Sequence, residues 1–217
     1  MTQSSDYTTR KTIYLTRHGE TDYNKQKIVQ GSGINSDLND TGKDQALRFY
    51  QAYKNVPFDA VYVSELKRTH QTVAHFANTH KQPTIMPEFN EINWGILEGK
   101  EPTPERYQHF LDVSAAWKAG DYQAAVEGGE SPLKMWERQQ IGLQKIMQEP
   151  HETILICMHG RAIRSFLCLL TQRPLKEMDQ FPHENTGLYI LEHEMELKFN
   201  ITTFNRTDHL NLNGKRH

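Results

Sequence analysis

Two His-Gly pairs stand at the ends of the two most strand-like segments of this sequence. His18 follows the short apolar run 13–16, and His159 follows the longer run 153–158. Ligands of open α/β sheets bind at the carboxyl ends of the strands. A single histidine in such a place is more often structural, but two at the edge of one sheet can face each other across one pocket. Their repetition therefore favours a functional site.

Two arginines and a carboxyl group are expected near these histidines. Arg17 directly precedes the first one, and Arg68 lies one helical turn beyond the end of a second predicted strand. Glu91 follows further along the chain, between Phe89 and Trp94. Because burial disfavours the ionised form of a carboxyl group, these aromatic neighbours predict a raised pKa for Glu91.

This set of side chains suits phosphoryl transfer. The planar fork of an arginine matches the oxygens of a phosphate. A neutral imidazole can attack phosphorus and form a covalent intermediate, while a second, protonated histidine stabilises charge in the transition state. A carboxyl group with a raised pKa donates a proton to the leaving oxygen. Since the arginines and the second histidine supply the positive charge, we expect no metal ion and no cofactor.

The predicted elements follow one another as in an α/β domain. Short apolar runs alternate with segments whose apolar residues recur at helical spacing, which favours a mostly parallel sheet covered on both faces. Two prolines and a pair of glycines mark the stretch from about 98 to 130 as an insertion. Strands are expected at 13–16, 60–63, 84–86, 153–158, 187–191 and 197–204, and helices at 40–56, 66–77, 132–148 and 162–170.

Composition and charge exclude several classes of protein. The formal net charge is -2, and no stripe of Lys and Arg marks a nucleic-acid-binding face. No apolar run is long enough to cross a membrane, and the N-terminus lacks the apolar core of a signal peptide. Cys157 and Cys168 lie in apolar runs and are expected to be buried thiols. We therefore expect a cytoplasmic protein with one domain over 1–217 and a flexible tail at 1–11.

Six segments together resemble the motifs of a known family. Each is weak by itself, but their order and spacing are specific, and the match covers most of the chain. On these segments the sequence resembles the histidine phosphatase superfamily, in its phosphoglycerate-mutase-like branch. The segments are the signature loop 17–21 with Asn24 behind it, the helix start 38–46, the second-arginine segment 64–72, the acid-bearing loop 91–99, the stretch 129–131 and the second histidine motif 158–160.

The resemblance implies a role for each catalytic candidate. His18 would be the nucleophile that becomes phosphohistidine. Glu91 would donate a proton to the leaving group and then act as the base that activates water. Arg17, Arg68 and His159 would form the cradle of the phosphate group.

The resemblance also implies the fold and further contacts with the substrate. It implies a three-layer α/β/α sandwich in which about 98–130 forms a small helical lid. Asn24 and Thr21, in or near the signature loop, would contact the phosphate ester. Gly160 would offer its backbone N–H at a helix start, where the helix dipole favours an anion. An apolar face on a lid helix would support a homodimer.

Hydrolysis and mutase chemistry can both proceed through the same phosphohistidine. Sugar-phosphate mutases of this branch tend to be longer and to carry basic residues beside the acid, whereas here Ile92 follows Glu91. We therefore expect a phosphomonoesterase that acts on a small phosphorylated metabolite, with a phosphoglycerate-type mutase as the alternative. The loop 17–24 and the chain length also resemble α-ribazole phosphatases. A non-catalytic phosphate binder would lack one of the key residues, and all are present.

Several neighbouring residues have a structural explanation. Glu98 is a second candidate acid that ranks behind Glu91, and it is expected to fix its loop; Glu20 is expected to anchor the signature loop. Arg161 is expected near the pocket. His183 borders the pocket or belongs to a surface turn, and the sequence leaves both open. No set of His, Cys and carboxylates has the spacing of a metal site, which argues against a metal-dependent hydrolase.

Overall fold

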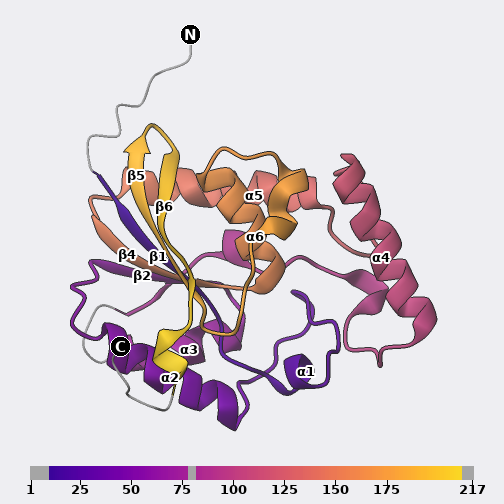
Figure 1. Ribbon diagram of the computed structural model, residues 1–217, viewed down its shortest axis with the longest axis horizontal. Coiled ribbons are helices and arrows are strands. Elements are labelled where there is room, and N and C mark those ends of the chain that lie inside the picture. The colour runs from indigo at the N-terminus through magenta and orange to yellow at the C-terminus, as the bar shows by residue number, and fades with distance from the viewer. Residues whose placement is uncertain (1–9, 78–81, 212–217) are drawn as a thin grey trace.

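A six-stranded mixed sheet runs through the middle of the computed structural model, which describes residues 10–77 and 82–211 (Figure 1). Its strands are β1 (Thr12–Arg17), β2 (Ala60–Val63), β3 (Thr84–Ile85), β4 (Thr153–Met158), β5 (Leu188–Met195) and β6 (Lys198–Arg206). Their order in the sheet is β3-β2-β4-β1-β5-β6. The first four strands pair in parallel, whereas β5 and β6 are antiparallel to their neighbours. The expected α/β fold with a mostly parallel sheet is confirmed.

Helices cover both faces of the sheet and complete the three layers. Helices α2 (Asp40–Tyr53) and α3 (Lys67–Ala77) pack on one face, and α5 (Pro132–Gln148) and α6 (Gly160–Leu170) pack on the other (Figure 1). Alternate residues of a strand point to opposite faces of a sheet. The inner residues of β4 are accordingly divided between two apolar clusters, one for each helical layer. All four expected helices are present, and α6 begins two residues earlier than predicted.

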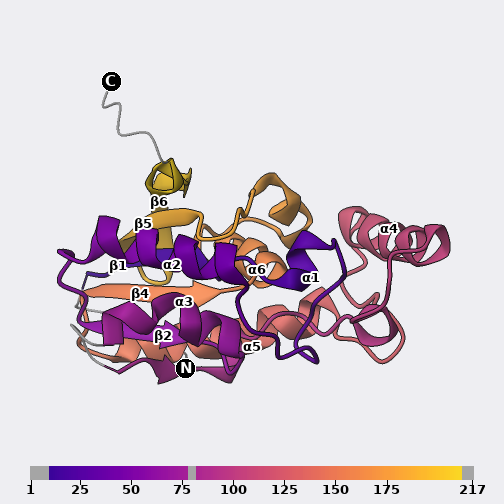
Figure 2. The same cartoon turned by 90° about the horizontal axis from the view of Figure 1, so that it is seen from below.

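One helix of the inserted segment stands away from the sheet. Helix α4 (Pro104–Ala119) begins after Thr103, whose side chain caps its first turn, and it ends at Gly120, whose φ of 97° suits glycine. Buried Trp117 donates its indole N–H to the carbonyl of Ala124 at 2.8 Å and so ties the helix to the following loop. Figures 1 and 2 show α4 beyond the edge of the sheet to which the carboxyl end of β4 points.

Short elements carry the loops at this edge. They are the single-turn helix α1 (Asp22–Lys25) and four 3-10 turns at Pro87–Phe89, Gly95–Leu97, Leu175–Gln180 and Asp208–Leu210. Within residues 10–77 and 82–211, no helix is both long and apolar enough to cross a membrane. Cys157 and Cys168 are free and buried, as expected.

The N-terminal segment is not wholly a tail. Residues 1–9 lie outside the described part of the chain, but Lys11 is only 1% exposed. Its ammonium donates to the carbonyls of Glu149 and His151 at 2.6 and 2.5 Å, just beyond the end of α5. The carbonyls at a helix end need such donors. The expectation of a flexible tail extending to residue 11 is therefore wrong at Lys11, which is held by its buried contacts.

Candidate active site

The two histidines meet because β1 and β4 are parallel neighbours. Arg17 pairs with Met158 in the register of these strands, and the backbone N–H of His18 donates to the carbonyl of Met158 at 3.0 Å. The chain then leaves both strands at the same edge of the sheet. The ring centroids of His18 and His159 lie 5.2 Å apart. The sequence predicted this juxtaposition, and the structure shows it.

His18 is a buried, neutral imidazole with one nitrogen held by the backbone. Its Nδ1 lies 2.7 Å from the carbonyl oxygen of Gly19. A carbonyl oxygen can only accept a hydrogen bond, so the proton lies on Nδ1 and the lone pair on Nε2. Burial, followed by the charges of Arg68 and Arg17, lowers the pKa of His18 well below its ordinary value. Nε2 is therefore unprotonated at neutral pH, as a nucleophile requires.

His159 is also neutral, and it is held behind His18. The Nε–H of Arg68 donates to its Nδ1 at 3.1 Å, and its Nε2 lies 2.8 Å from the hydroxyl oxygen of Ser64. Because an arginine N–H can only donate, the ring proton lies on Nε2. Burial and the charge of Arg68 lower the pKa of His159 well below its ordinary value. The expectation of a protonated second histidine is therefore wrong, since its Nδ1 already accepts a hydrogen bond from a cation.

Arg68 is a fully buried cation that lacks a carboxylate partner within 4 Å in the described chain. Besides its bond to His159, it donates to the carbonyls of Ile34 and Gly31 at 2.6 and 3.2 Å. A guanidinium has five N–H groups, so two remain for an anion. Burial lowers the pKa of Arg68 to about 10, which still leaves the side chain charged at neutral pH.

Arg17 is oriented by His183. The Nη1 of Arg17 donates to the carbonyl oxygen of His183 at 2.9 Å and lies 3.3 Å from its Nδ1. Burial and the charge of Arg17 lower the pKa of His183 to about 3, so this ring is a neutral acceptor. The Nε–H of Arg17 is buried and has no partner among the described residues. The question that the sequence left open is answered: His183 borders the pocket.

Glu91 lies at the start of α6 rather than in a purely apolar setting. Its Oε1 accepts from the backbone N–H groups of Ile92 and Ala162 at 3.0 and 2.8 Å, and its Oε2 accepts from that of Arg161 at 3.0 Å. The N-terminus of a helix favours a negative charge. Glu91 is buried, as expected, but three backbone donors also contact its carboxylate.

Asn24 is fixed through its side-chain oxygen, and its amide nitrogen has no partner among the described residues. Its Oδ1 accepts from the backbone N–H of Thr21 and from the side-chain amide of Asn185, both at 3.3 Å. Asn185 also donates to the carbonyl of His18 at 2.9 Å. The sequence analysis did not single out Asn185; its proximity to His183 was the only signal. One side chain thus ties the loop of His18 to Asn24.

Thr21 has a different place from the expected one. It is fully buried, and its hydroxyl caps α1 by accepting from the backbone N–H of Asn24 at 3.2 Å. It therefore positions Asn24 and does not face a ligand. Glu20 accepts from Asn39 at 2.8 Å and Glu98 accepts from the backbone N–H of Trp94 at 2.8 Å, so both acids anchor loops, as expected.

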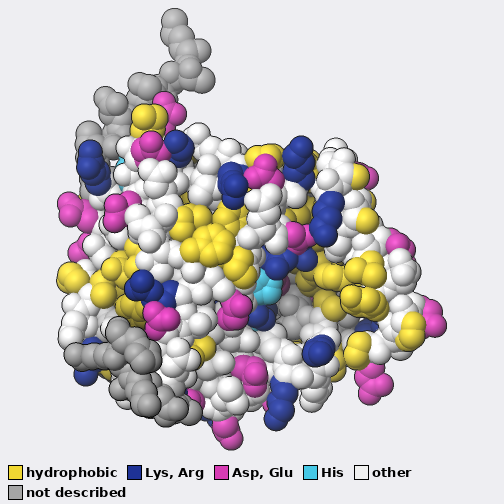
Figure 3. Space-filling model, viewed as in Figure 1, with side chains coloured by type: hydrophobic (Ala, Val, Ile, Leu, Met, Phe, Trp, Pro, Cys, Tyr) yellow, Lys and Arg dark blue, Asp and Glu magenta, His cyan; other side chains and the backbone are white. Residues whose placement is uncertain are grey.

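A cavity of about 180 Å³ brings most of these groups to one surface. Figure 3 shows a histidine in a hollow near the middle of the view, with charged side chains around it and hydrophobic ones toward α4. Of the predicted site residues, Arg68, His159 and Thr21 lie behind this surface, whereas the others line it. The lining residues are Arg17, His18, Asn24, Val29, Gln30, Glu91, Trp94, Phe110, Gly160, Arg161 and His183.

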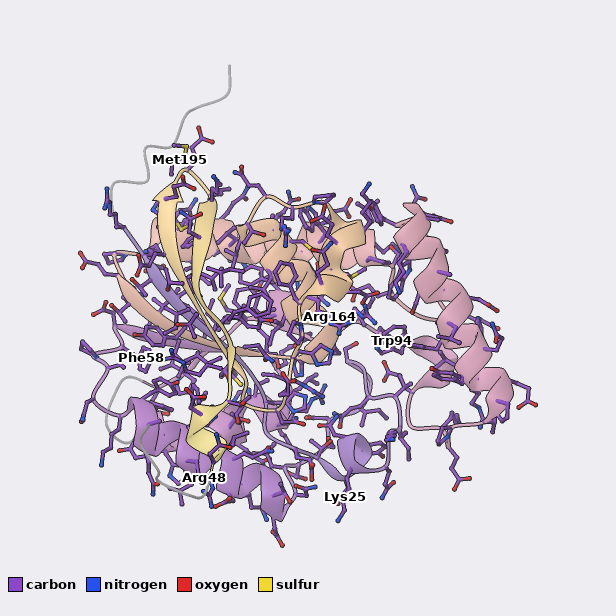
Figure 4. All side chains as sticks on the ribbon, in the orientation of Figure 1. Lys25, Arg48, Phe58, Trp94, Arg164 and Met195 are labelled. Atoms are coloured by element: carbon purple, nitrogen blue, oxygen red, sulfur yellow. The ribbon has the colours of Figure 1, made fainter. Side chains whose placement is uncertain are left out.

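Arg161 connects the start of α6 with the inserted segment. Its guanidinium lies over the rings of Trp94 and Trp117, at 5.8 and 5.3 Å from their centroids, and pairs with Asp179 at 2.7 Å. Figure 4 shows Trp94 at the side of the molecule that carries α4, with Arg164 on α6 nearby. Arg161 therefore lines the cavity, as expected, but its charge is already compensated.

Gly160 begins α6 and has no room for a side chain. A Cβ placed there would lie 3.1 Å from the ring of His183. The next two N–H groups of the helix, those of Arg161 and Ala162, are occupied by Glu91. Only the N–H of Gly160 at this helix start has no acceptor in the described chain. Among these described residues, no group of three or more His, Cys, Asp and Glu side chains is placed to hold a metal ion.

Comparison with known proteins agrees with this geometry. The family model described as histidine phosphatase superfamily (branch 1) matches residues 13–207. The chain belongs to this superfamily. It is thus a phosphatase of the histidine phosphatase type, a phosphoric monoester hydrolase. The phosphoglycerate-mutase-like resemblance read from the sequence is confirmed.

Three relatives illustrate the range of this similarity. The chain is 33% identical over 158 residues to fructose-2,6-bisphosphatase TIGAR B of Danio rerio, covering 70% of this chain and 58% of that one. It is 32% identical over 170 residues to a metal-independent phosphoserine phosphatase of Arabidopsis thaliana, and the match covers 74% of this chain and 68% of that one. A variant phosphoserine phosphatase of Entamoeba histolytica, solved with phosphoserine, superposes with a TM-score of 0.78 at 25% identity, covering 92% and 99%.

Proposed function

We propose that this protein hydrolyses a small phosphorylated metabolite through a phosphohistidine on His18, without a metal ion. One observation carries the proposal. Arg68 is a buried guanidinium and Arg17 a half-buried one, neither has a carboxylate partner in the described chain, and they flank a neutral histidine whose Nε2 has no partner there. Buried charges are normally paired, so this pair of cations calls for an anionic ligand beside the nucleophile.

In the first step, Nε2 of His18 attacks phosphorus as the bond to the leaving oxygen breaks. Glu91 gives its proton to that oxygen, which departs as an alcohol. The charge on the other phosphate oxygens is met by Arg17, Arg68 and the amide of Asn24. The Nδ1–H bond to Gly19 stabilises the positive charge that the ring gains when it becomes phosphorylated.

In the second step, water displaces the imidazole from phosphorus. Glu91, now a carboxylate, takes a proton from the water as its oxygen bonds to phosphorus. The P–N bond breaks, and its electron pair returns to Nε2 of His18. Inorganic phosphate leaves, and Glu91 keeps the proton that the next leaving group needs. His159 holds Arg68 in place throughout, since it accepts the Nε–H of that side chain.

The size of the cavity supports a small substrate. About 180 Å³ accommodates a phosphate group and part of a small alcohol. The relatives described above are named for phosphoserine and for fructose 2,6-bisphosphate, which are small phosphate esters of this kind. Ile92 gives no guidance here, because its side chain is fully buried and does not line the cavity.

The test is hydrolysis of p-nitrophenyl phosphate in excess EDTA. We compare the wild type with His18→Ala and, as a control, with His75→Ala, which replaces an exposed histidine on α3. We expect activity that survives chelation, persists in the control and vanishes in His18→Ala. Loss of wild-type activity in EDTA would contradict metal independence. Substantial activity in His18→Ala would overturn the assignment of the nucleophile.

A further inference from the structure

A second cavity adjoins the proposed active site and is used by none of the steps above. Its volume is about 200 Å³. It shares two walls, Val29 and Phe110, with the active-site cavity. The remaining lining residues come from the loop after α1, from the loop before α4 and from the first turn of α4. They are Lys27, Leu97, Lys100, Glu101, Pro102, Arg106 and Tyr107.

The shared walls are held by contacts that reach into the active site. The ring of Phe110 lies 5.0 Å from that of Trp94, which lines the active-site cavity. The backbone N–H of Gly99 donates to the carbonyl of Val29 at 2.9 Å and joins the two loops that form the walls. Val29 lies in the loop after α1, five residues beyond Asn24. The second cavity is therefore a continuation of the first one, with an apolar boundary between them.

The lining of this cavity carries excess positive charge. Lys27, Lys100 and Arg106 line it, against the single acid Glu101. None of these three cations has a carboxylate within 4 Å in the chain as described, whereas the arginines around α6 are paired. The Nη1 of Arg106 donates instead to the backbone carbonyl of Glu101 at 2.9 Å. The cations are thus free to meet a negative group of a ligand.

Lys27 is placed there by an unusual backbone conformation. Its φ of 57° lies in the left-handed region, which a residue with a side chain seldom adopts. Strain of this kind tends to occur at functional sites and is retained when the surrounding structure fixes it. Here the N–H groups of Lys27 and Ile28 donate to the carbonyls of Asn24 and Tyr23 at 3.1 and 2.9 Å. The turn that ends α1 therefore presents Lys27 to the second cavity.

We propose that the second cavity binds the distal part of the substrate, and that this substrate is a phosphate monoester with an apolar body and a second anionic group at its far end. The inference rests on the proposed function for the position of the phosphate. The ester oxygen lies beside Glu91, the apolar body crosses Val29 and Phe110, and the anionic group meets Lys27, Lys100 and Arg106. The inserted segment thereby selects the substrate as well as covering it.

The experiment compares three substrates that differ only beyond the ester oxygen. They are phenyl phosphate, naphthyl phosphate and naphthyl phosphate with a carboxylate on the ring carbon farthest from the ester. The double variant Lys100→Gln/Arg106→Gln removes two of the cations. The control is Lys25→Gln, which removes an exposed cation of α1 that lines neither cavity (Figure 4).

We expect kcat/KM to rise about tenfold from phenyl to naphthyl phosphate, since apolar area is buried. The carboxylate adds a further three- to tenfold, of the order that exposed charge pairs contribute. In the double variant we expect the two naphthyl esters to have equal kcat/KM and phenyl phosphate to keep its wild-type value. In Lys25→Gln all three values should stay as in the wild type. An equal kcat/KM for the two naphthyl esters overturns the proposal, as does an advantage that the double variant retains.

Binding of the matching arylmethylphosphonates, measured by calorimetry, separates this inference from the proposed function. These compounds are not hydrolysed, so their affinities report the second cavity even if the wild type fails to turn over phenyl phosphate. A carboxylate that strengthens binding only when Lys100 and Arg106 are present supports the inference. Equal affinities with and without the carboxylate overturn it, whatever the outcome of the hydrolysis assay.

Discussion

Replacing Arg138 should impair the proposed acid Glu91 without changing the Glu91 side chain itself. The Nε and Nη2 of this α5 side chain form a paired contact with the carboxylate of Glu130 at 2.7 and 2.9 Å. Its Nη1 and Nη2 also donate to the carbonyls of Glu88 and Glu91 at 2.7 and 3.3 Å. The 3-10 turn before Glu91 and the backbone of Glu91 itself are therefore held by one guanidinium.

The expected magnitude follows from these contacts. Arg138→Met keeps most of the apolar stem but leaves two carbonyls and a largely buried carboxylate without donors. Each unsatisfied group costs about 1–3 kcal/mol, and the ion pair is partly screened, so we expect a loss of about 3 kcal/mol in the free energy of unfolding. A catalytic group displaced by about 1 Å can lose about a hundredfold in rate. We expect this loss in the step that Glu91 serves as acid.

The assay uses the leaving group as the reporter. The rate of phosphoenzyme formation is measured by rapid quench with p-nitrophenyl phosphate, whose leaving group departs without a proton, and with an alkyl phosphate, whose leaving group needs one. We expect Arg138→Met to slow the alkyl ester about thirty- to a hundredfold and the p-nitrophenyl ester only a few-fold. Lys145→Met is the matched control, because Lys145 is also on α5 and, among the described residues, its ion pair is with the side chain of Glu88 and not with the backbone of Glu91.

Equal slowing of both esters by Arg138→Met would refute the reasoning. A loss that merely follows the fraction of unfolded protein would refute it as well, and urea unfolding of the same samples provides that fraction. If Lys145→Met behaved like Arg138→Met, the contact to the backbone of Glu91 would not be the cause.

Two further predictions concern the surroundings of the nucleophile. His183 has a pKa of about 3 in the folded protein against an ordinary value of 6.5, so the unfolded chain binds more protons between these values and stability falls as pH drops below 6.5. From pH 7 to pH 5 this difference in pKa lowers the free energy of unfolding by about 2 kcal/mol. We expect His183→Gln to remove that part of the pH dependence, measured by urea unfolding. If the variant kept the wild-type dependence of stability on pH, His183 would not be its source. Asn185→Ala removes the donor to the His18 carbonyl and to Asn24, and we expect kcat/KM to fall about tenfold and the melting temperature to fall by a few degrees, because the carbonyl loses its donor; an unaltered kcat/KM would show that this bridge is not needed for activity.

The elements that position the site could be predicted from local sequence. The strands 60–63 and 153–158 and the helix 132–148 have the predicted bounds, because each is a clear apolar pattern between turn-forming residues. The meeting of His18 and His159 followed from the rule that parallel strands end at one edge of a sheet. Such inferences need only the order of residues along the chain.

The corrected features depend on residues far apart in the sequence. Lys11 is buried because the end of α5, more than a hundred residues away, needs donors for its carbonyls. The proton of His159 lies on Nε2 because Arg68, from another helix, donates to Nδ1. A local sequence pattern does not indicate which distant partner a buried polar side chain will contact. The protonation of His159 and the burial of Lys11 could therefore not be predicted from motifs.

The distribution of charge at the carboxyl edge of the sheet determines which groups can meet the charge of the phosphate. The dipole of α6 was expected to bind phosphate, but the carboxylate of Glu91 already takes its second and third N–H groups. The charge of the phosphate must therefore be met mainly by Arg17 and Arg68, because His159 is neutral. In the proposed mechanism, the start of α6 therefore holds the acid and base, and the two arginines hold the phosphate.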